Sequence, residues 1–318
     1  MKLQWIDITI IFAYLFSMLM IGWLLRKKAR LNKENYLMGG KSLPWYMLGL
    51  SDASDMFDIS GTMWMVALCF IYGMKSMWIP WLWPVFNQVF MMMFLSKWLR
   101  RSNATTGAEW LTTRFGKGEK SSRASHNVVV AFALLSCFGF LAYGFIGLGK
   151  FTEIFIPWDM IQPYIRFHVS PEFVPHVYGI IFTLFATFYS VLGGMHSIVI
   201  GDFIKYMVMT LACISVAVIA FMHLHANGNS LHVPEGWHTP FFGWRLNDMD
   251  WGGIIADANK KIADDGFSLF GIFFMMMLFK GVFASLAGPA PNYDMQKILS
   301  TRSPKEASKM TGFVSIVL

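Results

Sequence analysis

The sequence predicts an all-α protein that crosses a membrane several times. Hydrophobic residues make up 55% of the chain and charged residues only 14%, whereas about a quarter of a soluble domain is charged. The mean hydropathy is +0.48, and the apolar residues fall in long runs instead of amphipathic stripes. A soluble protein could not cover so much apolar surface, so a single transmembrane domain is expected over residues 1–318.

The first helix is expected at roughly residues 5–25. Its run, WIDITIIFAYLFSMLMIGWLL, is about 20 residues long, which at about 1.5 Å per residue crosses a hydrocarbon core of roughly 30 Å. No basic segment precedes the run and no small-residue cleavage site follows it. These flanks favour a retained helix over a signal peptide.

Further apolar runs predict helices at about 45–71, 78–98, 126–149, 176–194, 197–222 and 267–289, with the start of another at 310–318. Lysine and arginine concentrate after the first, third and seventh runs. Basic loops remain on the cytoplasmic side of a plasma (inner) membrane, so the amino terminus is expected outside. Residues 223–266 then form a long outer loop, with room for a small helix within 252–265.

The remaining composition excludes several classes of protein. The net charge of +7 comes from those short basic loops and not from a basic domain, so nucleic-acid binding has little support. Cys69, Cys137 and Cys213 lie in apolar runs without a C-x-x-C spacing, as packed thiols do. No cofactor is predicted, and the histidines of the outer loop lack partners at metal-ligand spacing.

Three aspartates lie inside the second apolar run, in LGLSDASDMFDISGTMWMVALCF. They are Asp52, Asp55 and Asp58. A charged side chain at the centre of a lipid-facing helix costs about 2.5–3.5 kcal/mol on insertion scales. On a continuous helix their spacing confines them to a stripe about 120° wide. That stripe is expected to face the bundle interior or a water-filled cavity, although Asp52 could instead lie paired near the membrane edge.

The same run is expected to be broken near residues 53–58. Serines and a glycine crowd the aspartates, and serine hydroxyls compete with helical hydrogen bonds. Backbone carbonyls freed inside a membrane are tolerated only where they line a cavity. Carbonyl, carboxylate and hydroxyl oxygens are ligands for hard cations, which points to a coupling ion such as sodium.

The chain resembles the sodium:solute symporter family, which includes sodium/glucose, sodium/proline and sialic acid transporters. The resemblance runs from about residue 36 to 310 and rests on ordered motifs: NYLMGGKSLPWYMLGLS, ASDM, TGAEWLTTRFG, YSVLGGMHSIVIGDFIK and MQKILSTRSPKEASK. It implies inverted five-helix repeats preceded by one extra amino-terminal helix, and alternating access around the broken helix at 45–71.

The resemblance also implies a sodium site on the broken helix. Aligned on ASDM, Ala53 and Met56 supply backbone carbonyls and Asp55 the acidic side chain. Counting from SLPW shifts the register by one and nominates Ser54 and Phe57. Asp202 matches an aspartate that serves a second cation site in some members.

An ion pair between Asp202 and Lys205 is the alternative to that second site. The family's core has ten helices, and two hydroxyls on a later helix complete its sodium site. The resemblance therefore implies that this sequence is the front part of a longer transporter, with the second repeat incomplete and only a partial sodium site.

The solute is expected to be a small polar organic molecule, with a sugar or a related compound possible. Sugar-transporting members are expected to carry a tyrosine and an asparagine shortly before the position of Gln296–Lys297, a region in which FASLAGPAPNYDMQK carries alanine, glycine and proline. A glutamate expected of those members would fall near Pro80. The candidate residues of the substrate pathway are Asp58, Asp52, Lys280, Trp64 and Trp81.

Three functions are compatible with these features. The leading hypothesis is a sodium-coupled symporter that imports the solute and is not an enzyme. The second is a transporter-like sensor module of a longer signalling protein. The third is an intramembrane aspartyl protease, based on Asp202 and Asp294, because two carboxylates that share a proton can hydrolyse peptides.

Overall fold

The described part of the protein is almost entirely helical. The computed structural model describes residues 3–116, 118, 120–164, 168–226, 232–241, 249–267, 278–279, 281–283, 286 and 294–317. Within these residues the only β-type pairing is an isolated bridge between Leu43 and Thr301. The expected helix at 267–289, with Lys280, lies mostly outside them.

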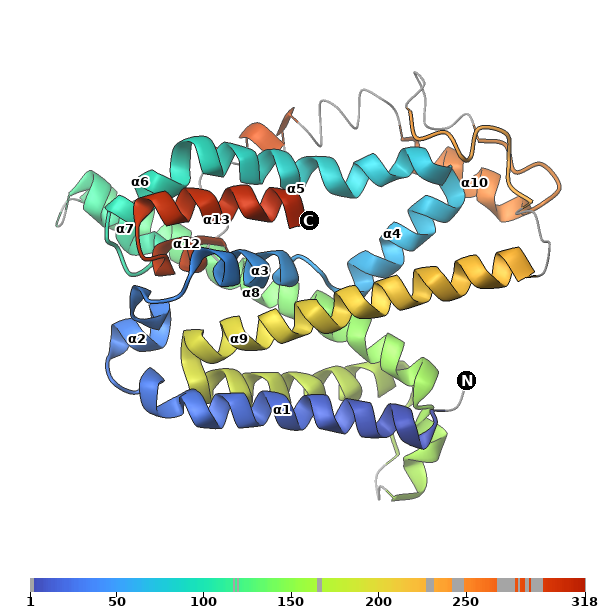
Figure 1. Cartoon of the computed structure of the whole chain (residues 1–318), viewed down its shortest axis with the longest axis horizontal. Helices are drawn as coiled ribbons and strands as arrows, with labels where there is room; N and C mark the ends of the chain where they lie inside the picture. The colour runs from blue at the N-terminus through green and yellow to red at the C-terminus, as the bar shows by residue number, and fades with distance from the viewer. Residues whose placement is uncertain are drawn as a thin grey trace.

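The principal elements follow one another along the chain (Figure 1). They are α1 (Trp5–Ala29), α2 (Lys33–Met38), η1 (Gly39–Lys41), α3 (Trp45–Asp55), α4 (Ile59–Tyr72), η2 (Gly73–Met77), α5 (Trp78–Phe90), the π-helical turn η3 (Met91–Leu95), α6 (Ser96–Arg101), α7 (Gly107–Phe115), α8 (Lys120–Phe155), α9 (Val174–Ala226), α10 (Ala256–Asp265), α12 (Asp294–Ser300) and α13 (Pro304–Val317).

Four helical stretches of the described residues are long and apolar enough to cross a membrane: Trp5–Ala29, Ile59–Arg101, Lys120–Phe155 and Pro171–Ala226. Much of their apolar surface is exposed; Phe12 on α1, Leu135 on α8 and Phe221 on α9 are each more than 60% accessible. Such surface is compatible with hydrocarbon and not with water. The chain is therefore an integral membrane protein.

Helix α9 contains a reversal at Gly194. The residue has φ 56° and ψ −156°, a conformation open essentially to glycine alone. The two halves of α9 leave this point as the arms of a V, one beside α1 and the other passing α3 (Figure 1). A Cβ at Gly194 would lie 2.8 Å from the carbonyl oxygen of Tyr36, so the reversal is also packed tightly against α2.

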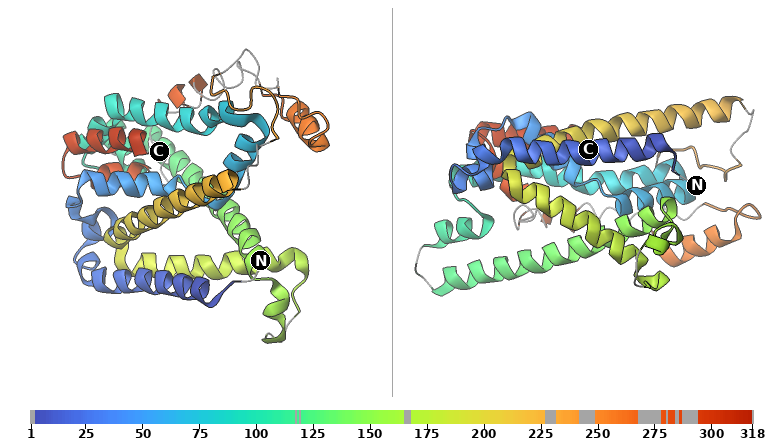
Figure 2. Two further views of the ribbon diagram at one scale, coloured as in Figure 1. Left: turned by 45° about the vertical axis from the view of Figure 1, so that its right-hand side comes forward. Right: turned by 90° about the horizontal axis from the view of Figure 1, so that it is seen from below.

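The largest buried cluster surrounds α3. It joins α3 to α2, α6, α9, α12 and α13 through Met38, Leu43, Leu48, Met91, Leu99, Met195, Val199, Met295, Ile298, Leu299, Ala307 and Met310. Leu48 is fully buried, as are Ser51 and Asp52 on the next turn of α3. Ser51 and Asp52 are therefore held in the interior of the bundle and not against lipid. Figure 2 shows the same bundle from two further directions.

A second buried cluster attaches residues 249–267, together with Val233 and Trp237, to the end of α4. Trp237 Nε1 donates to the Phe70 carbonyl oxygen at 2.8 Å, and Trp251 Nε1 donates to the Ile71 carbonyl oxygen at 2.9 Å. The Tyr72 hydroxyl donates to Asp265 of α10 at 2.9 Å. The last carbonyls of a helix lack intrahelical partners, and the two indoles fill that need for α4.

Candidate functional site: a charged cluster at the helix interruption

The interruption between α3 and α4 occupies residues 56–58. Met56 N–H donates to the Ala53 carbonyl oxygen at 3.2 Å, and Phe57 N–H donates to the Ser54 carbonyl oxygen at 3.3 Å. These bonds tighten the last turn of α3 into i→i+3 geometry. In the described part of the chain, no backbone N–H donates to the carbonyl oxygen of Met56 or Phe57.

Asp58 begins the next helix. Its Oδ1 accepts a hydrogen bond from Gly61 N–H at 2.7 Å, and its carbonyl oxygen accepts one from Thr62 N–H at 3.0 Å. Asp58 is thus the N-cap of α4, a position at which aspartate is favoured. Because the chain leaves helical geometry before it, Asp58 does not continue the stripe that a continuous helix would carry.

Asp52 and Asp55 share a face of α3 and meet Lys297 of α12. The Lys297 ammonium pairs directly with Asp55 Oδ2 and lies 3.6 Å from Asp52 Oδ1. The side chains of Asp52 and Lys297 are 0% and 4% exposed, whereas that of Asp55 is 30% exposed. Asp52 therefore faces the interior of the bundle, where it lies next to a buried lysine.

Asp202 of α9 approaches the same cluster from the other side. Ser51 donates a hydrogen bond to Asp202 Oδ2 at 2.6 Å. Lys205 Nζ lies 3.5 Å from Asp202 Oδ1 and 3.8 Å from Asp55 Oδ1. The pairing of Asp202 with Lys205 that the sequence suggested is present, and the same lysine also links Asp202 to the end of α3.

The five charges of this cluster do not cancel. Asp52, Asp55 and Asp202 carry three negative charges when ionised, and Lys205 and Lys297 carry two positive charges. Burial alone would lower the pKa of Lys297, but the carboxylates of Asp55, Asp52 and Asp202 hold that pKa above its usual value. With all five groups ionised, one net negative charge remains, which a monovalent cation would neutralise.

A cavity of about 320 Å³ opens beside the cluster. It is lined by Tyr36, Leu37, Asp55, Ser190, Val191, Gly194, Met195, Ile198, Gln296 and Lys297. Gln296 supports its wall by donating to the carbonyl oxygens of Leu37 at 2.9 Å and Thr105 at 3.3 Å. The partly exposed carboxylate of Asp55 is therefore accessible to a small ion.

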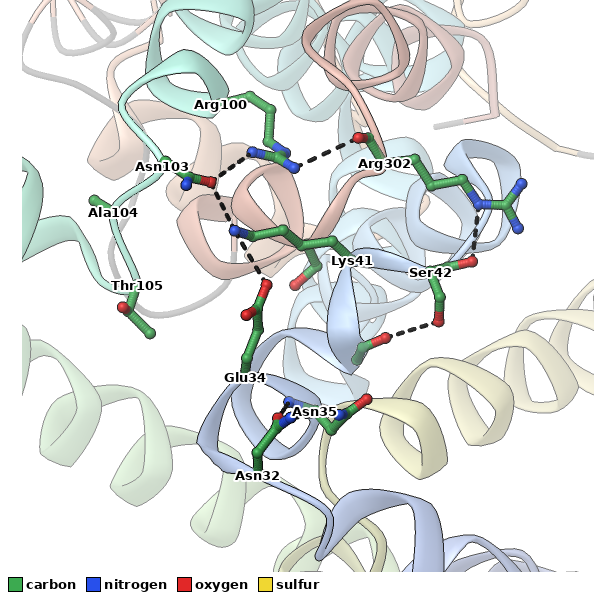
Figure 3. A network of polar contacts seen from close by, with 12 residues as sticks. Asn32, Glu34, Asn35, Lys41, Ser42, Arg100, Asn103, Ala104, Thr105 and Arg302 are labelled. Carbon is green, nitrogen blue, oxygen red and sulfur yellow. Dashed lines mark hydrogen bonds and ion pairs between the residues drawn. The ribbon is translucent and has the colours of Figure 1, made fainter.

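A polar network ties the segments next to this cavity together (Figure 3). Lys41 Nζ donates to Asn103 Oδ1 at 2.7 Å and pairs with Glu34 at 3.2 Å. Arg100 Nε donates to the Thr301 carbonyl oxygen at 2.6 Å. Arg302 Nε donates to the Ser42 carbonyl oxygen at 2.8 Å. The connection from α2 to α3 is thereby fastened to the end of α6 and to the turn between α12 and α13.

The other predicted residues lie in different surroundings. Ala53 and Ser54 are fully buried, and Met56 and Phe57 are partly buried. Trp64 on α4 and Trp81 on α5 are 44% and 41% exposed, and the Trp81 ring meets that of Trp78 edge to face. Lys280 lies outside the described residues.

The sequence pattern alone places Lys297 in a basic cytoplasmic loop, whereas the structure buries it between Asp52 and Asp55. A signal was present: its neighbours Met295, Ile298 and Leu299 are apolar, and all three are buried. A lysine within a short apolar run is a candidate for a buried ion pair.

An apolar helical bundle, with one helix interrupted at a buried charged cluster, is the architecture of a membrane transporter. The sequence profile of the sodium:solute symporter family matches residues 36–235, and the chain belongs to this family. The prediction of an all-α membrane protein of this family is confirmed.

Two relatives illustrate the similarity. The chain is 25% identical over 231 residues to a sodium/proline symporter of Staphylococcus aureus (strain Newman), a match that covers 71% of this chain and 41% of the relative. Its fold is similar to that of a Na+-coupled sialic acid symporter in a substrate-bound outward-open state. That match has a TM-score of 0.52 and 14% identity, and covers 98% of this chain and 56% of the other. The chain thus spans about half the length of these relatives.

Proposed function

We propose that the protein couples the movement of a small polar organic solute to the movement of sodium across the membrane. The single observation that carries the proposal is Asp55, a partly exposed carboxylate at the end of α3, beside carbonyls at a helix interruption. Family membership supports the reaction class, because the profile of sodium:solute symporters matches most of the chain.

The ion binds at the interruption in this proposal. Asp55 supplies the carboxylate, and Ala53 and Met56 supply carbonyl oxygens, or Ser54 and Phe57 in the shifted register. In the first register, the Ala53 carbonyl already accepts a backbone N–H and the Met56 carbonyl accepts none from the described residues. In the shifted register, the same holds for Ser54 and Phe57 respectively. A carbonyl oxygen has two lone pairs, so either pair can contribute to an oxygen-rich site. The net negative charge of the cluster favours a monovalent cation there.

Sodium competes with two lysines at this position. Lys297 and Lys205 each lie against one oxygen of Asp55, so an arriving ion must displace or share one of them. Asp202 is proposed as a second cation position. Lys205 links the two positions, because it lies near both carboxylates. When its ammonium moves toward Asp202, Asp55 Oδ1 becomes available to bind the ion.

The proposed solute is small, polar and organic. The cited relatives are named for proline and for sialic acid, both of which carry a carboxylate. The substrate pathway is proposed to include Asp58, Asp52, Lys280, Trp64 and Trp81. The basic end of the bundle, with the Lys41 network, is proposed to face the cytoplasm, which places the amino terminus outside.

The test is sodium-dependent stabilisation of the purified protein. A ligand that binds only the folded state raises stability by about 2.7 kcal/mol when its concentration is a hundred times its Kd. We expect a higher melting temperature in sodium chloride than in potassium chloride at equal ionic strength. Equal melting temperatures in the two salts over the whole concentration range would refute sodium binding.

A further inference from the structure

A hollow of about 610 Å³ lies where the α4–α6 run ends. It is lined by Trp98, Arg101, Ser102, Trp110, Thr113 and Arg114. Helix α6 ends an apolar stretch long enough to cross a membrane, so we expect the hollow at the level of the lipid headgroups. It includes the arginine of the TTRFG segment, which has no part in the sodium site.

Arg114 is held over aromatic rings. Its guanidinium carbon lies 4.6 Å from the centroid of the Trp98 ring and 5.6 Å from that of Trp110. Stacking on aromatic faces orients a guanidinium and leaves its edge N–H donors available. The Trp98 side chain is 52% exposed, and tryptophans of this kind are typical of the membrane–water interface.

The two arginines of the hollow have no anionic partner in the described part of the chain. No described carboxylate lies within 4 Å of the guanidinium of Arg101 or Arg114. Glu109, on α7 beside them, accepts a hydrogen bond from Thr105 N–H at 2.8 Å. Arg100, the neighbour of Arg101, is instead committed to the Thr301 carbonyl oxygen.

We propose that this hollow binds the phosphodiester headgroup of an anionic membrane phospholipid. A guanidinium group is opposite in charge to a phosphate, and its planar set of N–H donors can form paired hydrogen bonds with two phosphate oxygens. Basic pockets beside membrane helices are suited to anionic headgroups, and the two indoles provide apolar contact for the start of the acyl chains. This site is independent of the proposed sodium coupling.

The experiment measures lipid binding to the purified chain by native mass spectrometry. The probes are dioleoyl phosphatidylglycerol and dioleoyl phosphatidylcholine, which share acyl chains and a phosphate but differ in net charge. We expect the wild type to retain phosphatidylglycerol preferentially. Arg101→Gln with Arg114→Gln should lower that preference by about 25-fold, because each guanidinium near an anionic surface is worth roughly fivefold in affinity.

Arg123→Gln is the matched control. It removes one exposed guanidinium from the start of α8, outside the hollow, and should leave the preference within about twofold of the wild type, as diffuse surface charge is screened by salt. If the double variant is not recovered folded, Arg114→Gln alone should reduce the preference by about fivefold.

Three results would overturn the proposal. The first is equal binding of both lipids to the wild type. The second is an equal loss of preference in Arg123→Gln, which would indicate diffuse charge attraction. The third is complete displacement of phosphatidylglycerol by glycerol phosphate in excess, which would indicate a site for a soluble anion.

Discussion

Lys297 lies against Asp55 across 242 positions of the sequence. The contact joins α12 to the last residue of α3, and the same ammonium approaches the buried carboxylate of Asp52. A buried charge without a partner is strongly destabilising, so the position of the interrupted helix depends on a helix far away in the chain.

Lys297→Met should destabilise the protein by about 3–5 kcal/mol, because it leaves the buried charge of Asp52 without its nearby ammonium. Thermal unfolding of the purified protein measures the change. Lys261→Met is the matched control: it breaks an i,i+4 pair with Asp265 on α10, and such exposed pairs are worth about 0.3–0.5 kcal/mol. Equal losses of stability in the two variants would show that the buried Lys297 contributes no more than an exposed ion pair.

The proposed function predicts that Asp55→Ala abolishes the sodium stimulation of solute uptake while the protein remains inserted in the membrane. The variant removes the partly exposed carboxylate at the interruption, and with it the charge that favours a cation there. Uptake in sodium and in potassium media, normalised to inserted protein, measures the effect. Asp257→Ala on α10 is the control for an exposed carboxylate. Unchanged sodium dependence in Asp55→Ala would remove Asp55 from the site.

The proposed pathway role of Asp58 predicts that Asp58→Asn alters substrate choice or the pH dependence of uptake more than it alters sodium affinity. Asparagine caps a helix about as well as aspartate, so this variant removes the charge and keeps the start of α4. Asp58→Ala should cost about 1 kcal/mol in stability because the cap is lost. A substrate profile and pH optimum identical to the wild type in Asp58→Asn would limit Asp58 to its capping role.

Gly194→Ala should destabilise the protein by about 1–3 kcal/mol, because alanine is strained at this backbone conformation and its Cβ would press on the Tyr36 carbonyl oxygen. Gly139→Ala in α8 is the control, since a Cβ there meets nothing within 4 Å. The control should be neutral or slightly stabilising, as alanine favours helix over glycine. Similar melting temperatures for both variants would contradict the tight reversal.

The fold class could be predicted because it depends on composition and on the order of motifs. Long apolar runs identify membrane helices from local sequence alone, and five motifs in order identified the family. Asp55 could be nominated in the same way, because its neighbours form a short motif. None of this required knowing which helices pack together.

The local pair of Asp202 with Lys205 could be predicted, but the partners of Asp52 and Asp55 could not, because they depend on contacts between distant segments. Lys297 stands at the start of a segment rich in lysine and arginine, which is typical of a loop. The packing of α12 against α3 is what buries it. The spacing of Asp58 suggested a shared stripe with Asp52 and Asp55, but a helix interruption changes side-chain direction. The one-residue ambiguity between Ala53 and Ser54 also persists, since both carbonyls accept backbone hydrogen bonds.

The attachment of α10 and the segment before it to α4 has a consequence for observing the protein at work. Indole and phenol groups join three successive residues, Phe70, Ile71 and Tyr72, to the loop and α10. If this end of α4 tilts while those bonds hold, α10 must tilt with it. A fluorescent label on the exposed face of α10 would then report the angle of α4 without any label on α4 itself.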